Sequence, residues 1–118
     1  MQYLIAFMES PATFEHRSPI DNSGPDMGAW YAYIGAIRAS GIVTGGAGLM
    51  PPSTGAVVTV RDGGRQVVDG PYPDSKEQLG GFFIVEVPDL DTALEWAARS
   101  PAASDGSVIV RPLMPPMP

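Results

Sequence analysis

The chain contains no cysteine, which excludes disulfides, thiolate nucleophiles and cysteine metal sites. A secreted scaffold stapled by disulfides is disfavoured for the same reason, so we expect an intracellular, cytoplasmic protein. Long hydrophobic runs are also missing. The apolar stretch from Tyr3 to Met8 is too short to cross a membrane and lacks the basic flank of a signal peptide. We therefore expect no membrane association.

Basic residues are scarce. Seven Lys and Arg stand against 13 Asp and Glu, giving a net charge of −6. Proteins that bind nucleic acid neutralise phosphates with clustered cations. The composition therefore predicts no direct nucleic-acid partner.

Histidine occurs once, at His16, between Glu15 and Arg17 in a polar stretch without metal-ligand spacing. We interpret His16 as a surface residue and expect no metal site. The glycines from Gly45 to Gly48 resemble a phosphate-binding loop, but no Gly-Lys-Ser/Thr follows them. Close backbone packing in a sheet is the better interpretation, and we expect no cofactor.

What is present fits one domain, residues 1–118, with an irregular proline- and methionine-rich tail over 112–118. Compact apolar runs predict strands at 3–8, 82–87 and 107–111, and a further strand starts at 42–44. Asp62-Gly63-Gly64 predicts a hairpin turn between strands 55–61 and 65–69. Residues 10–25 read as a loop.

Two helices are expected. Within 26–40, helical spacing places five apolar residues on one inward face, and Gly41 ends the helix. These five are Met27, Trp30, Tyr31, Ile34 and Ile37. The second helix has Asp89 as its N-cap and ends before Ser100-Pro101. Its inward stripe is Leu90, Ala93, Leu94 and Ala97.

Without the hairpin, the order of elements is βαββαβ. This predicts an α+β, ferredoxin-like fold with an inserted β-hairpin, whose mainly antiparallel sheet carries both helices on one face. The opposite face would be bare and apolar. Packing of two such faces explains why the first and fifth strands look buried on both sides, so we expect a homodimer.

The segment from Val68 to Phe83 contains Asp69-Gly70-Pro71-Tyr72 and resembles the signature of the DGPF proteins, a branch of the YCII-related family. Tyr72 replaces the phenylalanine of that signature. The similarity extends over nearly the whole chain, through Gly46-x-Gly48-Leu49-x-Pro51, Arg61-Asp62-Gly63, Asp89-Leu90-Asp91-x-Ala93-Leu94-x-Trp96-Ala97 and Val110-Arg111-Pro112. This resemblance implies a dimeric α/β barrel.

The resemblance implies less about chemistry. Some YCII-related proteins are enzymes that act on small aromatic substrates through a histidine and an aspartate. Here the first helix starts with Asp26-Met27-Gly28 where such relatives have the histidine, and Ser100-Pro101 stands where they have Asp-Pro. The dyad therefore cannot be transferred. DGPF members also resemble proteins found beside, or fused to, extracytoplasmic-function sigma factors, which motivates a regulatory alternative with a sigma factor as partner.

Four residues form the candidate site. Asp69 is either a catalytic carboxylate held by a rigid turn or a turn residue that ends a strand. Lys76 and Glu77 are either an acid/base or anion-binding pair that lines a pocket, or a solvated ion pair on a loop. Arg111 either binds an anionic ligand or pairs with a carboxylate such as Asp69 or Glu86.

Together these features give two hypotheses. The first is a cofactor-free lyase or isomerase that binds a small polar or aromatic, anionic ligand between helix and sheet, with Asp69, Lys76 and Glu77 as catalytic residues and Arg111 as ligand-binding residue. The second is a non-enzymatic accessory dimer associated with extracytoplasmic-function sigma factors.

Overall fold

A computed structural model describes residues 1–15, 24, 27–69 and 77–117. Its strands are β1 Gln2–Glu9, β2 Val43–Gly48, β3 Ala56–Arg61, β4 Gly64–Asp69, β5 Gln78–Glu86 and β6 Ser107–Pro112. Its helices are α1 Pro11–Glu15, α2 Met27–Ala39, α3 Leu90–Ala98 and α4 Ala102–Asp105, with a 3₁₀ turn, η1, at Pro52–Thr54.

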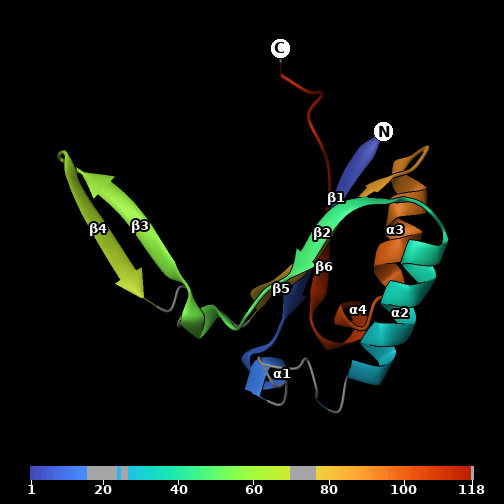
Figure 1. The fold of residues 1–118 in the computed structure, drawn as a ribbon, viewed down its shortest axis with the longest axis horizontal. Helices are drawn as coiled ribbons and strands as arrows, with labels where there is room; N and C mark the ends of the chain where they lie inside the picture. Colours follow the sequence, from blue (N-terminus) through green and yellow to red (C-terminus); the bar gives the residue numbers. More distant parts are fainter. Residues whose placement is uncertain (16–23, 25–26, 70–76, 118) are drawn as a thin grey trace.

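Four of the strands form one antiparallel sheet in the order β2-β5-β1-β6 (Figure 1). β1, the compact apolar run, lies inside this sheet, as its composition predicts. The order is that of a ferredoxin-like βαββαβ unit, so the predicted α+β fold is confirmed. The remaining strands, β3 and β4, pair only with each other, as the inserted hairpin.

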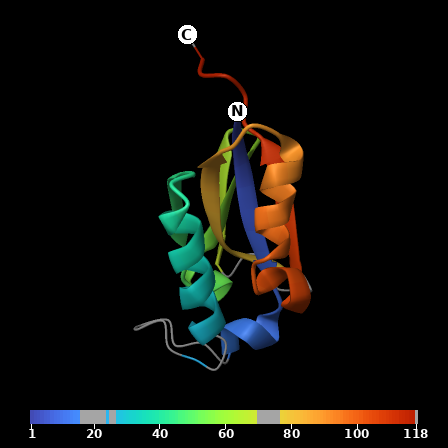
Figure 2. The same cartoon turned by 90° about the vertical axis from the view of Figure 1, so that its right-hand side faces the viewer.

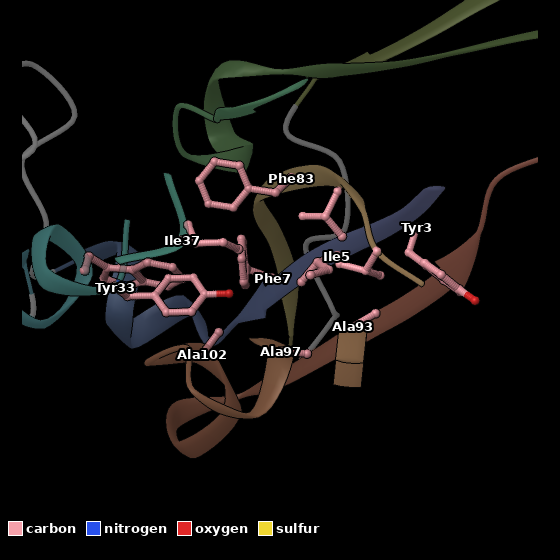
Figure 3. Packing of buried hydrophobic residues seen from close by; sticks show 12 residues of the cluster. Tyr3, Ile5, Phe7, Tyr33, Ile37, Phe83, Ala93, Ala97 and Ala102 are labelled. Atoms are coloured by element: carbon pink, nitrogen blue, oxygen red, sulfur yellow. The ribbon is translucent and has the colours of Figure 1, made fainter. Parts of the chain in front are cut away.

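Helices α2 and α3 cover one face of the four-stranded sheet (Figure 2). Between them and the sheet, Ile5, Ile37 and Val85 are fully buried (Figure 3). The ring of Phe7 makes edge-to-face contacts with Trp30 at 5.0 Å, and with Tyr33 and Phe83 at 5.9 Å each. Such pairs add to the stabilisation from burial alone, so this aromatic group anchors α2 to the sheet.

Both predicted helix faces need correction. In α2 the buried residues are Trp30, Tyr33 and Ile37, whereas Tyr31 is 58% exposed. In α3 the buried residues are Ala93 and Ala97, and the two predicted leucines are exposed. Because alanine side chains are small, this face of the helix can lie close to β1 and β6. These exposed leucines are Leu90 and Leu94.

Two short helices were missed. α1 lies in the predicted loop, and α4 follows directly after Pro101, which ends one helix and begins the next. Other local predictions are confirmed. Asp89 caps α3 by accepting the Thr92 N–H at 2.9 Å, and Asp62 and Gly63 have φ of 53° and 76°, as the hairpin turn requires.

The second face of the sheet is not covered by a helix. Cross-strand pairing places Leu4 beside Ile84 and Arg111, and Ala6 beside Phe82 and Ile109. We call this surface the open face. Ala6 is buried, Leu4, Phe82 and Ile84 are partly buried, and Ile109 is exposed. In the part of the chain that is described, no helix is long and apolar enough to span a membrane.

Candidate functional site

Of the four predicted site residues, the structure describes the side chains of two, Glu77 and Arg111. Asp69 ends β4, in the hairpin, and its backbone pairs with Ala56. Lys76 lies outside the described residues. Glu77 is exposed directly before β5, and its Oε2 accepts a hydrogen bond from Oγ of Ser107 at 2.6 Å.

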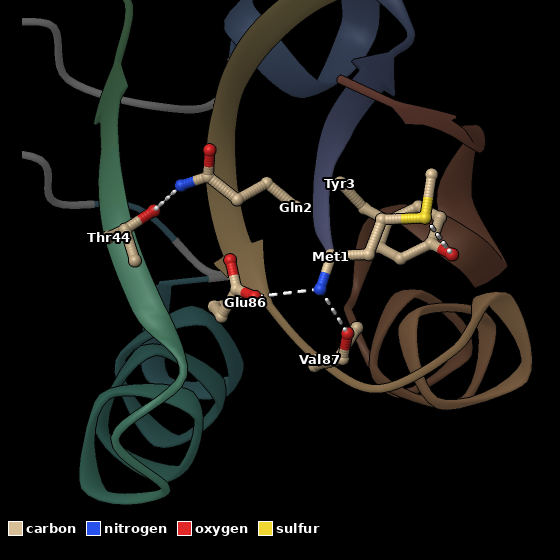
Figure 4. Close-up of polar contacts among 6 residues, drawn as sticks. All are labelled: Met1, Gln2, Tyr3, Thr44, Glu86 and Val87. Carbon is tan, nitrogen blue, oxygen red and sulfur yellow. Dashed lines mark hydrogen bonds and ion pairs between the residues drawn. The ribbon is translucent and has the colours of Figure 1, made fainter. Parts of the chain in front are cut away.

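Arg111 lies on the open face, at the other end of β6 from Ser107. Arg111 lies four positions after Ser107, which is about 14 Å along a strand. Glu77 and Arg111 therefore belong to different ends of that face, away from the expected cleft between helix and sheet. Glu86, one of the carboxylates considered as a partner of Arg111, forms its ion pair with the Met1 ammonium group at 2.7 Å (Figure 4).

A different set of polar residues lies at the helix-covered face, where β1 ends. Glu9 is 2% exposed and pairs across the sheet with Gln78, which is also buried. Thr13 of α1 is buried; its hydroxyl contacts that of Ser10 at 3.1 Å and donates to Oδ2 of Asp105 at the end of α4. We call Glu9, Thr13, Gln78 and Asp105 the acidic cluster.

Aromatic rings adjoin this cluster. Side chains alternate along a strand, so Glu9 lies on the same face as Phe7, whose ring contacts Trp30. The hydroxyl of Tyr33 donates to the carbonyl oxygen of Trp96 at 2.9 Å. Burial raises the pKa of Tyr33 to about 12, with the charge of Arg99 opposing the shift, so Tyr33 stays neutral near pH 7 and is not a base.

The residue that replaces the relatives' aspartate has a structural role. Ser100 is buried, and its hydroxyl donates to the carbonyl oxygen of Ala97 at 2.8 Å, at the end of α3. The same carbonyl oxygen accepts the backbone N–H of Ser100 at 3.2 Å, so the hydroxyl adds a second bond at the helix end. Ser100 therefore stabilises the helix end. His16 lies outside the described residues.

The acidic cluster escaped the sequence analysis, although β1 carried a signal for Glu9. Side chains alternate along the strand, so Ile5, Phe7 and Glu9 point to the same face. The carboxylate of Glu9 therefore continues a row of buried apolar residues. No sequence pattern indicated Asp105, because it belongs to the unexpected helix α4.

Chemically, this end of the sheet offers carboxylates beside hydroxyl groups and an aromatic wall. Carboxylates can accept and return protons. The rings of Phe7, Trp30 and Tyr33 are buried against one another and form the apolar surroundings of this end of the sheet. Among the described residues, no group of three or more His, Asp and Glu is arranged to hold a metal ion. A separate open pocket of about 400 Å³ is lined by Arg38, Val43, Thr44, Gly45, Gly46 and Phe83. It contains no carboxylate, so proton transfer fits the acidic cluster better.

Comparisons with known proteins place the chain in a family. One solved structure is 5-chloro-2-hydroxyhydroquinone dehydrochlorinase from Burkholderia phenoliruptrix AC1100, in complex with 2,5-dihydroxybenzoquinone. It aligns with a TM-score of 0.55 over 97% of this chain and 94% of that one, at 21% identity, which supports the fold. An uncharacterized protein of Rhizobium meliloti (strain 1021) is 41% identical over 67 residues, 55% of this chain and about half (54%) of that relative. The YCII-related domain matches residues 1–116, and this protein therefore belongs to the YCII-related family.

Proposed function

We propose that this protein is a cofactor-free enzyme of the lyase or isomerase type, acting on a small hydroxylated aromatic or similarly polar ligand. The observation that carries the proposal is the buried Glu9 carboxylate at the end of a strand whose preceding inward residue, Phe7, belongs to an aromatic wall. A buried carboxylate is costly for a fold, and such residues are frequent at functional sites.

The elimination proposed needs no redox partner. A carboxylate accepts a proton from the substrate, the electron pair of the broken bond forms a new double bond, and the leaving group departs with its own bonding pair as an anion. In an isomerisation, the carboxylate would return the proton to another atom. Asp105 and the hydroxyl of Thr13 are hydrogen-bonded to each other, and they can act as a second pair of groups that accepts or donates a proton.

We base the proposed class of ligand on the solved structure that resembles this chain. That protein is a dehydrochlorinase of a chlorinated hydroxyhydroquinone and was solved with a dihydroxybenzoquinone. Both molecules are oxygenated rings, whose hydroxyl and carbonyl groups suit the acid and hydroxyl groups of the acidic cluster. The predicted residues Asp69, Lys76, Glu77 and Arg111 remain candidates for ligand contacts. Glu77 directly precedes Gln78 of the acidic cluster, so the signature reaches this end of the sheet.

The test combines binding and turnover. Wild-type protein is screened by thermal shift with 2,5-dihydroxybenzoquinone, and chloride release is followed with 5-chloro-2-hydroxyhydroquinone. We expect a raised melting temperature and release of chloride, both lost in Glu9→Gln. The matched control is Glu95→Gln, an exposed residue of α3, which should behave as wild type.

Two results would count against the enzyme. One is equal behaviour of Glu9→Gln and wild type in both assays. The other is a stable complex with a purified extracytoplasmic-function sigma factor, together with no response to either aromatic compound. That second result would favour the accessory-protein alternative.

A further inference from the structure

The open pocket beside the end of α2, which we call the edge pocket, differs in chemistry from the acidic cluster. Its volume is about 400 Å³, within the range of roughly 300–1,000 Å³ that holds small organic ligands. Its lining contains one charged side chain, that of Arg38, and no carboxylate. A cation therefore sets the charge of this pocket, in a chain whose net charge is −6.

Arg38 has no partner for its charge within the part of the chain that the structure describes. The ion pair seen there joins Met1 and Glu86, and Arg38 takes part in none. No acidic residue occurs in α2, so the helix itself offers no counter-ion. The structural alternative for Arg38 is its place in the last turn of α2, where a positive charge suits the helix dipole. That role leaves the five N–H groups of the guanidinium available to an anion.

The polar side chain next to Arg38 in the lining is already engaged. The hydroxyl of Thr44 accepts a hydrogen bond from Nε2 of Gln2 at 3.2 Å (Figure 4). It donates its own proton to the carbonyl oxygen of Ile84 at 3.3 Å. Arg38 is thus the lining side chain whose donors face no protein acceptor among the described residues.

The carboxylate that comes to this edge of the sheet is compensated. The backbone N–H of Glu86 donates to the carbonyl oxygen of Ile42 at 2.8 Å, directly before the lining residue Val43. The Glu86 carboxylate is paired with the Met1 ammonium group. Its negative charge therefore does little to repel an anion from the pocket.

The backbone of β2 supplies a second donor. β2 is an edge strand that pairs only with β5. Leu49 donates to Gly80 across this ladder at 2.9 Å, and hydrogen-bonded and non-bonded pairs alternate along an antiparallel ladder. Counting back from Leu49, Gly46 and Phe83 form a non-bonded pair. The N–H of Gly46 therefore points away from β5, to the free edge of the sheet.

Only glycine fits at this position. Gly46 has a φ of +142°, and a Cβ there would lie 2.3 Å from the carbonyl oxygen of Phe82. The glycine run that resembles a phosphate-binding loop thus has a structural cause. The same cause leaves the backbone of this lining residue without a side chain to cover it.

The rest of the lining is apolar. Phe83 belongs to the buried core, and Val43 packs against that core. An arginine binds a carboxylate through two parallel hydrogen bonds. A phosphate carries three acceptor oxygens and more charge, and it would leave part of its demand unmet here. We infer that the edge pocket binds a small organic carboxylate, held by Arg38 and the Gly46 N–H, with its apolar part against Val43 and Phe83.

The first test titrates the full chain with benzoate and follows its backbone N–H groups by NMR. We expect a saturable shift of the Gly46 signal. Benzamide, which has the same shape and no charge, should bind about tenfold or more weakly, because charge-assisted hydrogen bonds are the stronger ones. The signal of Gln78, at the acidic cluster, should stay in place.

The second test changes the cation. Arg38→Gln should weaken benzoate binding about tenfold or more, and Arg38→Lys should fall between this variant and wild type, since lysine keeps the charge but lacks the planar fork. The matched control is Arg65→Gln, which removes an exposed arginine from the hairpin and should bind benzoate as wild type does. Melting temperatures without ligand check that all three variants are folded.

Three outcomes would overturn the inference. The first is the absence of a saturable shift of Gly46 with benzoate. The second is equal affinity for benzoate in folded Arg38→Gln and in wild type. The third is a shift of Gly46 that inorganic phosphate produces at lower concentration than benzoate. Because the signal is read at Gly46 and no turnover is measured, this test succeeds or fails independently of the enzyme proposed at the acidic cluster.

Discussion

Oγ of Ser107 lies 2.6 Å from Oε2 of Glu77 and joins the start of β6 to the residue that precedes β5. Met8 is the cross-strand partner of Ser107, so this contact lies at one end of the open face. It gives Glu77, the only signature carboxylate whose side chain is described, a defined position. An exposed hydrogen bond of this kind holds a side chain in place but adds little to stability.

Removal of this contact should separate function from stability. We expect Glu77→Ala and Ser107→Ala each to lower the free energy of unfolding by less than about 1 kcal/mol, measured by urea denaturation. If Glu77 contacts the ligand, its variant alone loses the thermal shift with 2,5-dihydroxybenzoquinone. An intact thermal shift in Glu77→Ala would remove this residue from the site.

A glycine in β2 should be far less tolerant. Gly46 has a φ of +142°, and a Cβ there would lie 2.3 Å from the carbonyl oxygen of Phe82. We expect Gly46→Ala to cost about 3 kcal/mol or more in urea unfolding, because a strained backbone and a clash with backbone act together. Gly48→Ala is the control, since its Cβ would meet nothing within 4 Å, and it should stay within about 0.5 kcal/mol of wild type. Equal losses at both positions would contradict this account.

The cap of α3 should make stability depend on pH. Hydrogen bonds from the hydroxyl and the backbone N–H of Thr92 lower the pKa of Asp89 below its usual value of 3.8. The folded state therefore binds this proton less tightly than the unfolded state, so the contribution is complete above about pH 4 and falls as the pH drops through the folded pKa. Asp89→Asn should keep the cap and lose this pH dependence, whereas Asp89→Ala should lose both. Thermal melts between pH 2 and 7, roughly spanning this titration, measure the difference.

The fold could be predicted from the sequence because the patterns that indicate its strands and turns are local and occur several times along the chain. Asp62-Gly63 permits the positive φ values of the hairpin turn, and the apolar run from Tyr3 to Met8 provides the central strand β1. Helix faces were harder to predict. In α2, both Tyr31 and Tyr33 fit next to Trp30 in an apolar stripe, and only packing against Phe7 and Trp96 selects Tyr33.

The site could be predicted less well than the fold. Motif resemblance directed attention to Asp69 and Glu77, whereas the buried carboxylate Glu9 belongs to no motif. The rest of the acidic cluster comes from distant parts of the chain: Gln78 pairs with Glu9 across the sheet, and Asp105 of the unexpected helix α4 accepts a hydrogen bond from Thr13. A sequence pattern records neighbours along the chain, so it could not reveal a cluster that only the sheet and the helix ends assemble.

The last prediction concerns the buried tyrosine that joins α2 to α3. Because burial raises the pKa of Tyr33 to about 12, the folded state holds the phenolic proton more tightly than the unfolded state, in which a tyrosine ionises near its usual pKa of 10.0. Its contribution to stability is therefore complete below about pH 10 and is lost as the pH rises toward 12. Tyr33→Phe removes the bond to the Trp96 carbonyl and should cost about 1 kcal/mol near pH 7.

Absorbance at alkaline pH and urea unfolding measure the two effects together. In the wild type, one tyrosine should ionise last, and that transition should be missing from Tyr33→Phe. The variant should also lose stability less steeply than wild type above pH 10, roughly where exposed tyrosines ionise. Tyr31→Phe is the matched control, because Tyr31 is exposed on the same helix, and it should keep both the late transition and the steep loss. A late transition that persists in Tyr33→Phe would show that another residue carries the shifted pKa.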